Sequence, residues 1–279
     1  MPRRRVTPAP ASASFTGLLL AATLAVVPLA SAESAGAPQP AERERVDRTF
    51  SVATLNILGS NHTAGPDFRR TKRTAHLIRR QHLKLFAMQE VQADQLRGLR
   101  RRLSQDRFWP AKKLGPGGLR LQIAWRPARF DLVDYGTLTT TFSHQERPLP
   151  WVRLLDEATG RRVFVINIHN SPQNQERDRD AATREEIRLF KRLRERGPAL
   201  ILGDANERRE WFCRVARRTG AHAANGGSYS NADGCVPPDR MYVDWLMEGG
   251  EVAWRNYQAV DVRVSDHRLH RAILRWRRL

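Results

Sequence analysis

Short apolar runs alternate with charged segments along most of the chain, and the spacing of the apolar positions predicts the secondary structure. Runs rich in β-branched and aromatic side chains predict strands at residues 50–58, 85–88, 121–125, 130–138, 152–155, 162–168 and 199–202, followed by three runs that end at Trp276. Apolar positions three or four residues apart predict helices over residues 68–82, 93–103, 175–196 and 208–218. This order favours an α/β fold, a four-layer α/β/β/α sandwich with two mixed sheets packed face to face.

Polar clusters close or directly follow the apolar runs at six places. They are Asn56, Gln89-Glu90, His169-Asn170, Gly203-Asp204-Ala205-Asn206, Asp244 and Ser265-Asp266-His267. Parallel and mixed sheets place residues at neighbouring strand ends side by side, so we expect these groups to form one site. Carboxylates, carboxamides and histidines suit metal-assisted attack on a phosphate.

The length of 279 residues and a hydrophobic share of 41% allow one sizeable core, and we expect a single domain over residues 49–279. The segment before it differs in composition. Three arginines, an apolar stretch over residues 15–30 and a small-x-small cleavage pattern are typical of a secretory signal peptide over residues 1–32. Residues 33–48, rich in Ala, Pro and charge, indicate a disordered lead-in.

The alternative for the apolar stretch is a transmembrane anchor, but it is shorter than the roughly 20 apolar residues that a span needs. We therefore expect a secreted protein, cleaved near Ala32, with no stable membrane anchor.

Cys213 and Cys235 are the two cysteines of the sequence, and both follow the expected cleavage point. An even cysteine count in an exported protein predicts a disulfide, here closing a loop of about 22 residues and worth roughly 3 kcal/mol. The alternative is two buried free thiols, and no neighbouring His or Cys pattern indicates a zinc site.

The formal net charge is +19, or +16 once the three arginines of the signal segment are removed. Such a charge favours polyanionic partners such as nucleic acid, anionic lipid headgroups or cell-wall polymers. Only five of the 48 basic residues are lysines, an imbalance that GC-rich coding also produces without selection for a ligand.

The polar clusters suggest chemical roles. Glu90 offers a hard oxygen ligand of the kind that Mg²⁺ prefers, although a glutamate here also suits the first turn of a helix. Asn56 either holds the water shell of a metal or makes a turn. Asp204 and Asn206 can face one cavity, where one orients water and the other donates to a phosphate oxygen, and the alternative is an Asx turn. A histidine held by a carboxylate, as Asp244 could hold His267, suits proton transfer, although taken alone His267 would more often be structural.

All six clusters, in this order, resemble the endonuclease/exonuclease/phosphatase superfamily over about residues 50–274. The resemblance implies a metal-dependent phosphoric ester hydrolase with Mg²⁺ as cofactor, Mn²⁺ or Ca²⁺ being alternatives. It implies three metal-holding residues, namely Asn56, Glu90 and Asp266, with Glu90 as the principal ligand. It implies five catalytic residues, namely His169, Asp204, Asn206, Asp244 and His267.

The same resemblance implies a separate role for each catalytic residue. Asp204 positions the attacking water, Asn206 steadies the phosphate, and Asp244 orients His267. His169 contacts the scissile phosphate and protonates the leaving oxygen, as in deoxyribonuclease-like members and unlike apurinic endonucleases. The remaining histidines have no motif around them and are interpreted as surface or core residues: His62, His76, His82, His144, His222 and His270.

The first hypothesis is a monomeric nuclease that acts on DNA or RNA with low sequence specificity. Basic residues over 69–73, 79–80 and 100–102 could follow a phosphate backbone or form a solvated face. The alternatives are a lipid-headgroup phosphodiesterase of the sphingomyelinase type or a small-molecule phosphomonoesterase. Tryptophans that are scattered rather than clustered argue against membrane docking. A non-catalytic polyanion binder should have lost a site residue, and the site is intact.

Overall fold

The computed structural model describes residues 47–63 and 68–277. The expected signal peptide and most of the expected lead-in lie outside these residues. Within the described part of the chain, no helix has the length and apolar character needed to cross a membrane.

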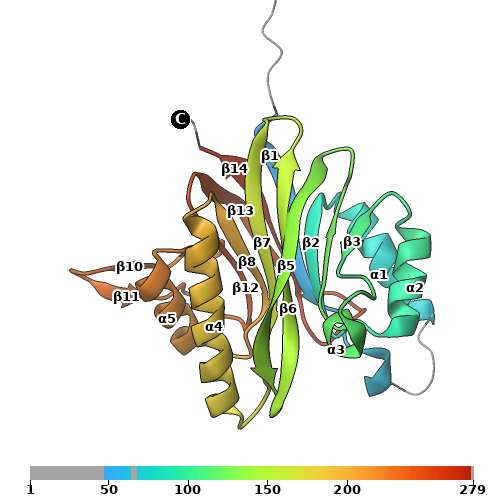
Figure 1. Ribbon diagram of the computed structural model, residues 1–279, viewed down its shortest axis with the longest axis horizontal. Helices are drawn as coiled ribbons and strands as arrows, with labels where there is room; N and C mark the ends of the chain where they lie inside the picture. The colour runs from blue at the N-terminus through green and yellow to red at the C-terminus, as the bar shows by residue number, and fades with distance from the viewer. Residues whose placement is uncertain (1–46, 64–67, 278–279) are drawn as a thin grey trace, which may run out of the picture. The chain divides into compact units, whose positions relative to one another are not determined.

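Two six-stranded mixed sheets form the centre of the fold (Figure 1). The first has the order β13-β14-β1-β2-β4-β3, with strands β1 (Thr49–Asn56), β2 (Leu85–Gln89), β3 (Arg107–Trp109), β4 (Gln122–Trp125), β13 (Val252–Val260) and β14 (Leu269–Trp276). The second has the order β5-β6-β7-β8-β12-β9, with strands β5 (Phe130–Phe142), β6 (Gln145–Asp156), β7 (Arg161–His169), β8 (Ala199–Asp204), β9 (His222–Ala223) and β12 (Asp244–Gly249). β1 runs parallel to β2 and β7 parallel to β8, whereas the other neighbours are antiparallel.

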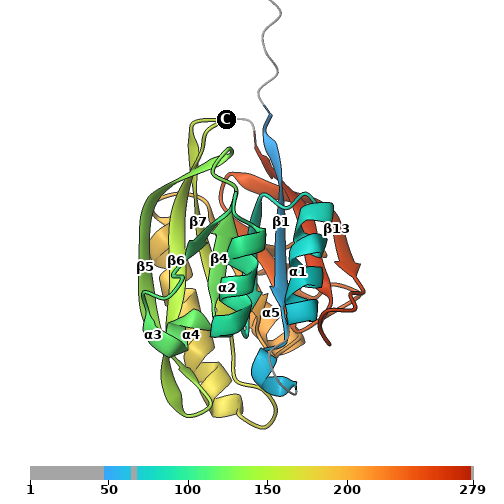
Figure 2. The same ribbon diagram turned by 90° about the vertical axis from the view of Figure 1, so that its right-hand side faces the viewer.

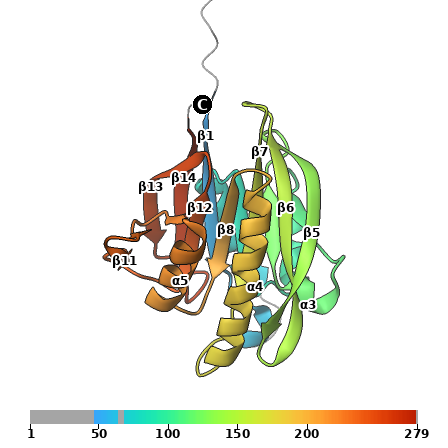
Figure 3. The same ribbon diagram turned by 60° about the vertical axis from the view of Figure 1, so that its left-hand side comes forward.

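Helices cover the outer faces of both sheets. α1 (Phe68–Arg80) and α2 (Ala93–Arg102) pack on the first sheet (Figure 2). α4 (Glu176–Arg194) and α5 (Arg209–Thr219) pack on the second (Figure 3). A short helix, α3 (Gly115–Leu119), a 3-10 turn, η1 (Ser60–His62), and a two-stranded hairpin, β10 (Ser228–Ser230) with β11 (Gly234–Val236), complete the described elements. The predicted fold class, a four-layer α/β/β/α sandwich, is confirmed.

Strand β8 shows how the sequence produces these layers. Its side chains alternate between faces, as they must in a strand. Leu200 and Leu202 join the core between the two sheets, whereas Ala199 and Ile201 join the core under α4 and α5. A strand buried on both faces needs a continuous apolar sequence, and that is why this run carries no polar alternation.

The hairpin β5–β6 is longer than predicted. The sequence suggests strands at 130–138 and 152–155, but pairing extends from Phe130↔Asp156 to Phe142↔Gln145. Pro148 and Pro150 argue against a strand, because proline cannot donate to a ladder. Both prolines lie in the part of β6 that pairs only with β5, since pairing with β7 begins at Trp151.

The predicted disulfide is confirmed. It joins Cys213 on α5 to Cys235 on β11, with the two Cα atoms 5.5 Å apart. The bond holds the β10–β11 hairpin, which falls in a region expected to be a loop, against α5.

Candidate active site

Five strands bring their polar ends together at one edge of the two sheets. In the parallel pair β1–β2, Asn56 lies opposite Gln89, and in β7–β8, His169 lies opposite Asp204. Antiparallel β12 begins at Asp244, directly opposite Asp204. The strand ends predicted from the sequence to converge therefore do so.

Asn56 links the two sheets at the site. Its amide nitrogen Nδ2 donates to Glu90 Oε1 at 2.9 Å and lies 3.2 Å from Asp204 Oδ2. The other carboxylate oxygen of Glu90 accepts from the main-chain N–H of Gly59 at 2.9 Å. Glu90 itself has a φ of 61°, a left-handed conformation that is uncommon for a residue with a side chain. Backbone strain of this kind gathers at functional sites, where the surrounding structure holds it.

A second pair of side-chain amides, those of Gln89 and Asn167, fixes the end of β2. The Gln89 side chain donates to Asn167 Oδ1 at 2.7 Å, across the interface between the sheets. Asn167 in turn donates to the main-chain oxygens of Met88 and Gln122 at 2.9 and 3.0 Å. Because these groups are buried, each needs its partner, and the pairing sets the position of Glu90 relative to β7.

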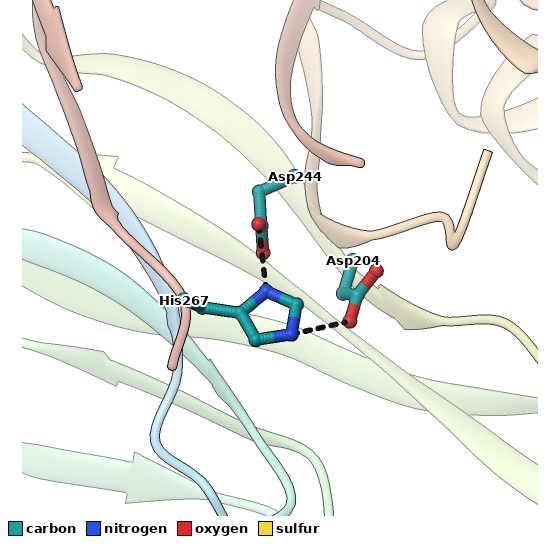
Figure 4. A group of neighbouring side chains, drawn as sticks. All are labelled: Asp204, Asp244 and His267. Atoms are coloured by element: carbon teal, nitrogen blue, oxygen red, sulfur yellow. Dashed lines mark hydrogen bonds and ion pairs between the residues drawn. The ribbon is translucent and has the colours of Figure 1, made fainter. Parts of the chain in front are cut away.

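Asp204, Asp244 and His267 form the centre of the site (Figure 4). His267 Nδ1 lies 2.8 Å from Asp244 Oδ2, and His267 Nε2 lies 3.7 Å from Asp204 Oδ2. The imidazole therefore stands between two carboxylates from adjacent strands. The Ser265 hydroxyl positions this loop, because it donates to the main-chain oxygen of Asn56 at 2.6 Å and accepts from the His267 N–H.

The electrostatic surroundings of His267 and Asp204 make one an acid and the other a base. Burial alone would lower the pKa of His267, but the hydrogen bond and negative charge of Asp244 outweigh it and raise the pKa to about 9. Burial raises the pKa of Asp204 to about 7, and the neighbouring charge of Asp244 adds to the rise. At neutral pH, His267 is protonated and Asp204 is close to its titration midpoint.

His169 and Glu90 are shifted in ways that fit their surroundings. His169 Nε2 lies 3.6 Å from Asp204 Oδ2, but burial lowers the pKa of His169 to about 3, so its imidazole is neutral. Burial would raise the pKa of Glu90, yet the hydrogen bonds from Gly59 and Asn56 bring it below its usual value. Glu90 is thus held as a carboxylate.

Gly203 and Asn206 shape the segment around Asp204. Gly203 has a φ of 143°, and a Cβ there would lie 2.1 Å from the Ile168 main-chain oxygen, so only glycine permits this pairing of β7 and β8. The Asn206 N–H donates to Asp204 Oδ1 at 2.8 Å, and its side chain donates to the Asn170 main-chain oxygen, also at 2.8 Å. The Asx turn, given as an alternative from the sequence, is present, and the roles of Asp204 and Asn206 at a phosphate stay a prediction.

Asp266 is the predicted site residue with the weakest connection to the others. Its side chain is exposed, and the Ser265 hydroxyl lies 3.2 Å from its Oδ1. Among the described residues, the set close enough to share a metal ion is Asp204, Asp244 and His267, with ligand atoms within 4.8 Å of one another. That set is already joined through the His267–Asp244 hydrogen bond, whereas Mg²⁺ prefers oxygen ligands alone.

Two histidines that carry no sequence motif also lie at the site. His62 Nε2 is 3.3 Å from Glu90 Oε2, and His270 Nε2 is 3.8 Å from Asp244 Oδ2. The Tyr257 hydroxyl lies 2.7 Å from His270 Nδ1 and fixes that ring behind Asp244. No local pattern could have identified these residues, because their contacts arise from the packing of distant segments.

Comparison with protein families gives one decisive result. The model of the Endonuclease/Exonuclease/phosphatase family matches residues 53–267, most of the chain and all six polar clusters. The chain belongs to this family. The resemblance stated from the sequence is therefore confirmed, and membership makes the protein an endonuclease/exonuclease/phosphatase-type phosphoesterase. A comparison with curated protein sequences finds no match.

Solved structures share the fold of this endonuclease/exonuclease/phosphatase chain. Human nocturnin, whose catalytic domain was solved with bound sulfate, is 18% identical, with 82% of this chain and 95% of that chain covered and a TM-score of 0.63. A mannosyl-6-phosphatase of Bacteroides thetaiotaomicron is 16% identical, covering 81% and 99%, with a TM-score of 0.62. D. rerio TDP2, solved with a single-strand DNA product, is 15% identical, covering 82% and 99%, with a TM-score of 0.61. At these identities the likeness concerns the fold.

Proposed function

We propose that this phosphoesterase is a secreted, divalent-metal-dependent nuclease that hydrolyses phosphodiester bonds of DNA or RNA with low sequence specificity. The observation that carries the proposal is the continuous set of contacts from Glu90 through Asn56 and Asp204 to His267 and Asp244. It places an ionised carboxylate, a carboxyl near its titration midpoint and a protonated imidazole at one edge of the sheets. These are the groups that hydrolysis of a phosphate ester requires.

The residues around Glu90 fit a divalent metal. Glu90 is held as a carboxylate with its side chain 15% exposed, and Asn56 directs its amide nitrogen to Glu90 while its amide oxygen accepts from the Leu58 N–H. We assign metal binding to Glu90, Asn56 and Asp266, with Mg²⁺ as the expected ion and Mn²⁺ or Ca²⁺ as alternatives. When bound, the ion would supply positive charge to the phosphate oxygens.

Asp204 is the group that we assign to the attacking water. With its pKa near 7, it is deprotonated in a large share of molecules at neutral pH and can accept the water proton as the water oxygen bonds to phosphorus and the bond from phosphorus to the leaving oxygen breaks. The leaving oxygen then takes a proton from solvent water. The Asn206 N–H holds one carboxylate oxygen, and the other, Oδ2, faces Asn56 and the two histidines of the site. We assign the Asn206 side chain to the phosphate, once substrate displaces its contact with Asn170.

His267 and His169 differ in charge and therefore in role. His267, protonated up to about pH 9, provides the positive charge that stabilises the negative charge building on the phosphate oxygens. Asp244 keeps it protonated and oriented. His169 is neutral, so we assign it a hydrogen bond to the leaving oxygen rather than transfer of a proton.

Nucleic acid as the substrate is supported by the net charge, +16 once the three arginines of the signal segment are removed, which attracts polyanions through counterion release. TDP2 adds support, because one related fold was solved with a DNA product. The mannosyl-6-phosphatase shares the fold as well, so phosphomonoesters belong in the test. Secretion rests on the signal-like segment over residues 1–32, and we propose that the mature protein begins near Glu33 and acts as a monomer.

The test starts with the full chain expressed in an exporting host. Edman degradation of protein from the medium should give an N-terminus near Glu33, and light scattering should give a monomer. Protein that stays in the cell with residue 1 intact would contradict secretion. The recovered protein is incubated with plasmid DNA and with RNA, in Mg²⁺ and in EDTA, beside His267→Ala and Asp204→Ala variants and an Arg192→Ala surface control.

Metal-dependent nicking should appear in the wild type and the control and fall about 10²- to 10⁴-fold in the two site variants. Far-UV circular dichroism checks that each variant is folded. Full activity in either site variant would overturn the site assignment. Hydrolysis of mannose 6-phosphate or of lipid headgroups, with none of polynucleotide, would move the substrate to those classes and refute the nuclease.

A further inference from the structure

Two half-buried arginines beside the site have no hydrogen-bonded or ion-paired anionic partner. Arg120 Nε and Arg147 Nη1 are inaccessible to solvent, and no hydrogen bond or ion pair reaches either guanidinium from the residues that the structure describes. Elsewhere the domain pairs its largely buried arginines. Arg129, for example, lies 2.7 Å from Asp156 Oδ1. A cation that is withdrawn from water without a partner is unfavourable. Two such arginines beside each other therefore indicate that a ligand supplies the anion.

The position of Arg120 is fixed by the pairing of β2 with β4. Met88 lies opposite Gln122 in that antiparallel pair. The Val91 N–H donates to the Arg120 main-chain oxygen at 3.1 Å and continues the ladder past the end of both strands. Arg120 is therefore the cross-strand neighbour of Glu90, and the Glu90 charge acts on its guanidinium.

Arg147 reaches the same site from the β5–β6 hairpin. The tip of that hairpin is anchored beyond the end of β7, because the Ser143 N–H donates to Ser171 Oγ at 2.9 Å and the His144 N–H to Asp178 Oδ2 at 2.6 Å. The Arg147 guanidinium carbon lies 3.6 Å from the centre of the Phe142 ring. Phe142 packs edge-on against His169, with ring centres 4.9 Å apart, so one aromatic ring separates the guanidinium from the site.

The two guanidinium groups act on each other. Burial and the nearby positive charge of Arg120 together lower the pKa of Arg147 to about 10, and Glu90 only partly opposes both. Burial likewise lowers the pKa of Arg120. Both remain protonated at neutral pH and repel each other, and a phosphate between them would relieve the repulsion. Guanidinium groups are suited to this because they bind phosphate oxygens through two parallel N–H groups.

We propose that Arg120 and Arg147 form a second phosphate subsite, which holds a non-scissile phosphate of the substrate next to the one being hydrolysed. This rests on the proposed phosphodiesterase activity and narrows it to substrates that carry at least two phosphates. The second phosphate can come from the neighbouring diester of a strand or from a terminal monoester of a short nucleotide.

The test compares thymidine oligonucleotides that differ in phosphate number. TpT has one phosphate, pTpT adds a terminal monoester, and TpTpT adds a second diester. Each is hydrolysed with Mg²⁺ by the wild-type protein, by Arg120→Gln, by Arg147→Gln, and by Arg192→Gln, an exposed arginine on α4 that serves as the control. The readout is the ratio of kcat/KM for a two-phosphate substrate to kcat/KM for TpT.

Loss of one charge-assisted contact should reduce that ratio by about 10- to 150-fold in each subsite variant and leave it unchanged in Arg192→Gln. Arg147→Lys should restore part of the loss. A reduction for pTpT alone assigns the subsite to a terminal phosphate, and a reduction for TpTpT alone assigns it to the strand. An unchanged ratio for both substrates overturns the proposal, as does an equal loss on TpT, which would place the arginines on the scissile phosphate.

Binding measurements distinguish failure of the subsite proposal from failure of the nuclease proposal. Titration calorimetry in EDTA measures pTpT and TpT without turnover. Tighter binding of pTpT or TpTpT than of TpT, lost in Arg147→Gln, supports the subsite even in a protein that hydrolyses none of them. Equal binding of all three by the wild type overturns it, whatever the activity.

Discussion

The buried carboxyl of Glu186 makes the sharpest stability prediction. Glu186 lies on α4, is 0% exposed, and accepts hydrogen bonds from Trp211 Nε1 at 2.9 Å and Asn170 Nδ2 at 3.5 Å. Its Oε1 is buried without a partner, and no arginine, lysine or histidine of the described chain pairs with it. Burial raises the pKa of Glu186 to about 7, and the charge of Glu207 adds to the rise.

The direction in which pH changes the stability follows from comparing the folded and unfolded states. In the unfolded chain this carboxyl titrates at 4.5, so below that pH both states are protonated and ionisation has no effect on stability. Between pH 4.5 and about 7 the unfolded state loses its proton while the folded state keeps it, and folding becomes less favourable. The difference of about 2.5 units, at 1.36 kcal/mol each, removes about 3 kcal/mol of stability by pH 8.

Glu186→Gln keeps an oxygen for the Trp211 hydrogen bond and cannot ionise. The free energy of unfolding of the variant minus that of the wild type, both measured with urea, should be about 3 kcal/mol larger at pH 8 than at pH 4. The packing cost of the amide is the same at both pH values and cancels in this comparison. Glu195→Gln, an exposed glutamate just after α4, is the control and should give a difference that does not change with pH.

The reasoning would be refuted if the difference in unfolding free energy between Glu186→Gln and the wild type also did not change with pH. It would mean that water or an unrecognised donor reaches Glu186 in the folded protein and stabilises its charge. Hydrogen exchange of the Trp211 indole would then identify the opening.

Three further predictions concern the site and its support. The pH profile of kcat/KM should rise to about 7, where Asp204 loses its proton, and fall above about 9, where His267 loses its own, and a profile without the alkaline limb would contradict the role of His267. Gly203→Ala sets a Cβ 2.1 Å from a main-chain oxygen of β7 and should lower the urea-unfolding free energy by at least about 2 kcal/mol, whereas an unchanged midpoint would show that β7 and β8 can separate freely. Replacing Cys213 and Cys235 by serine should lower the free energy of unfolding by about 3 kcal/mol, and equal stability in the two proteins would show that the 22-residue separation does not constrain the unfolded chain.

Long apolar runs made the central strands predictable, and short elements were missed for a physical reason. β3, β10 and β11 have three residues each, too few for a period of two to stand out from a loop. The sequence Gly115-Pro116-Gly117-Gly118 likewise indicates a turn, yet it lies in α3, which packs against β6. Tertiary contacts, rather than local preference, decide the state of such segments.

The site was predictable where chemistry and strand ends coincide. Asp204, Asp244 and His267 each lie at or near the end of an apolar run, so their convergence follows from the sheet order. The metal role of Asp266 stays a prediction. Glu186 could not be identified, because its helix is rich in charge and the adjacent Glu185 has the same local pattern but lies beside Arg188 at the surface. Only packing distinguishes them.

The positions of the buried charged groups connect these results. Asp156 lies far from the catalytic edge, at the other end of β6, and meets Arg129 directly. At the catalytic edge the balance differs, because Asp204 and Glu186 are buried with raised pKa values and Arg147 with a lowered one. Each would be more stable in water, so the fold holds them there at a cost that packing elsewhere offsets. A protein selected for stability alone would have paired or replaced them. Burial alone does not mark the site, because Glu248, near the far end of β12, also has a pKa raised to about 7. Asp204 differs from Glu248 in its contacts with Asn56 and His267, and those contacts are what make its carboxyl part of a catalytic site.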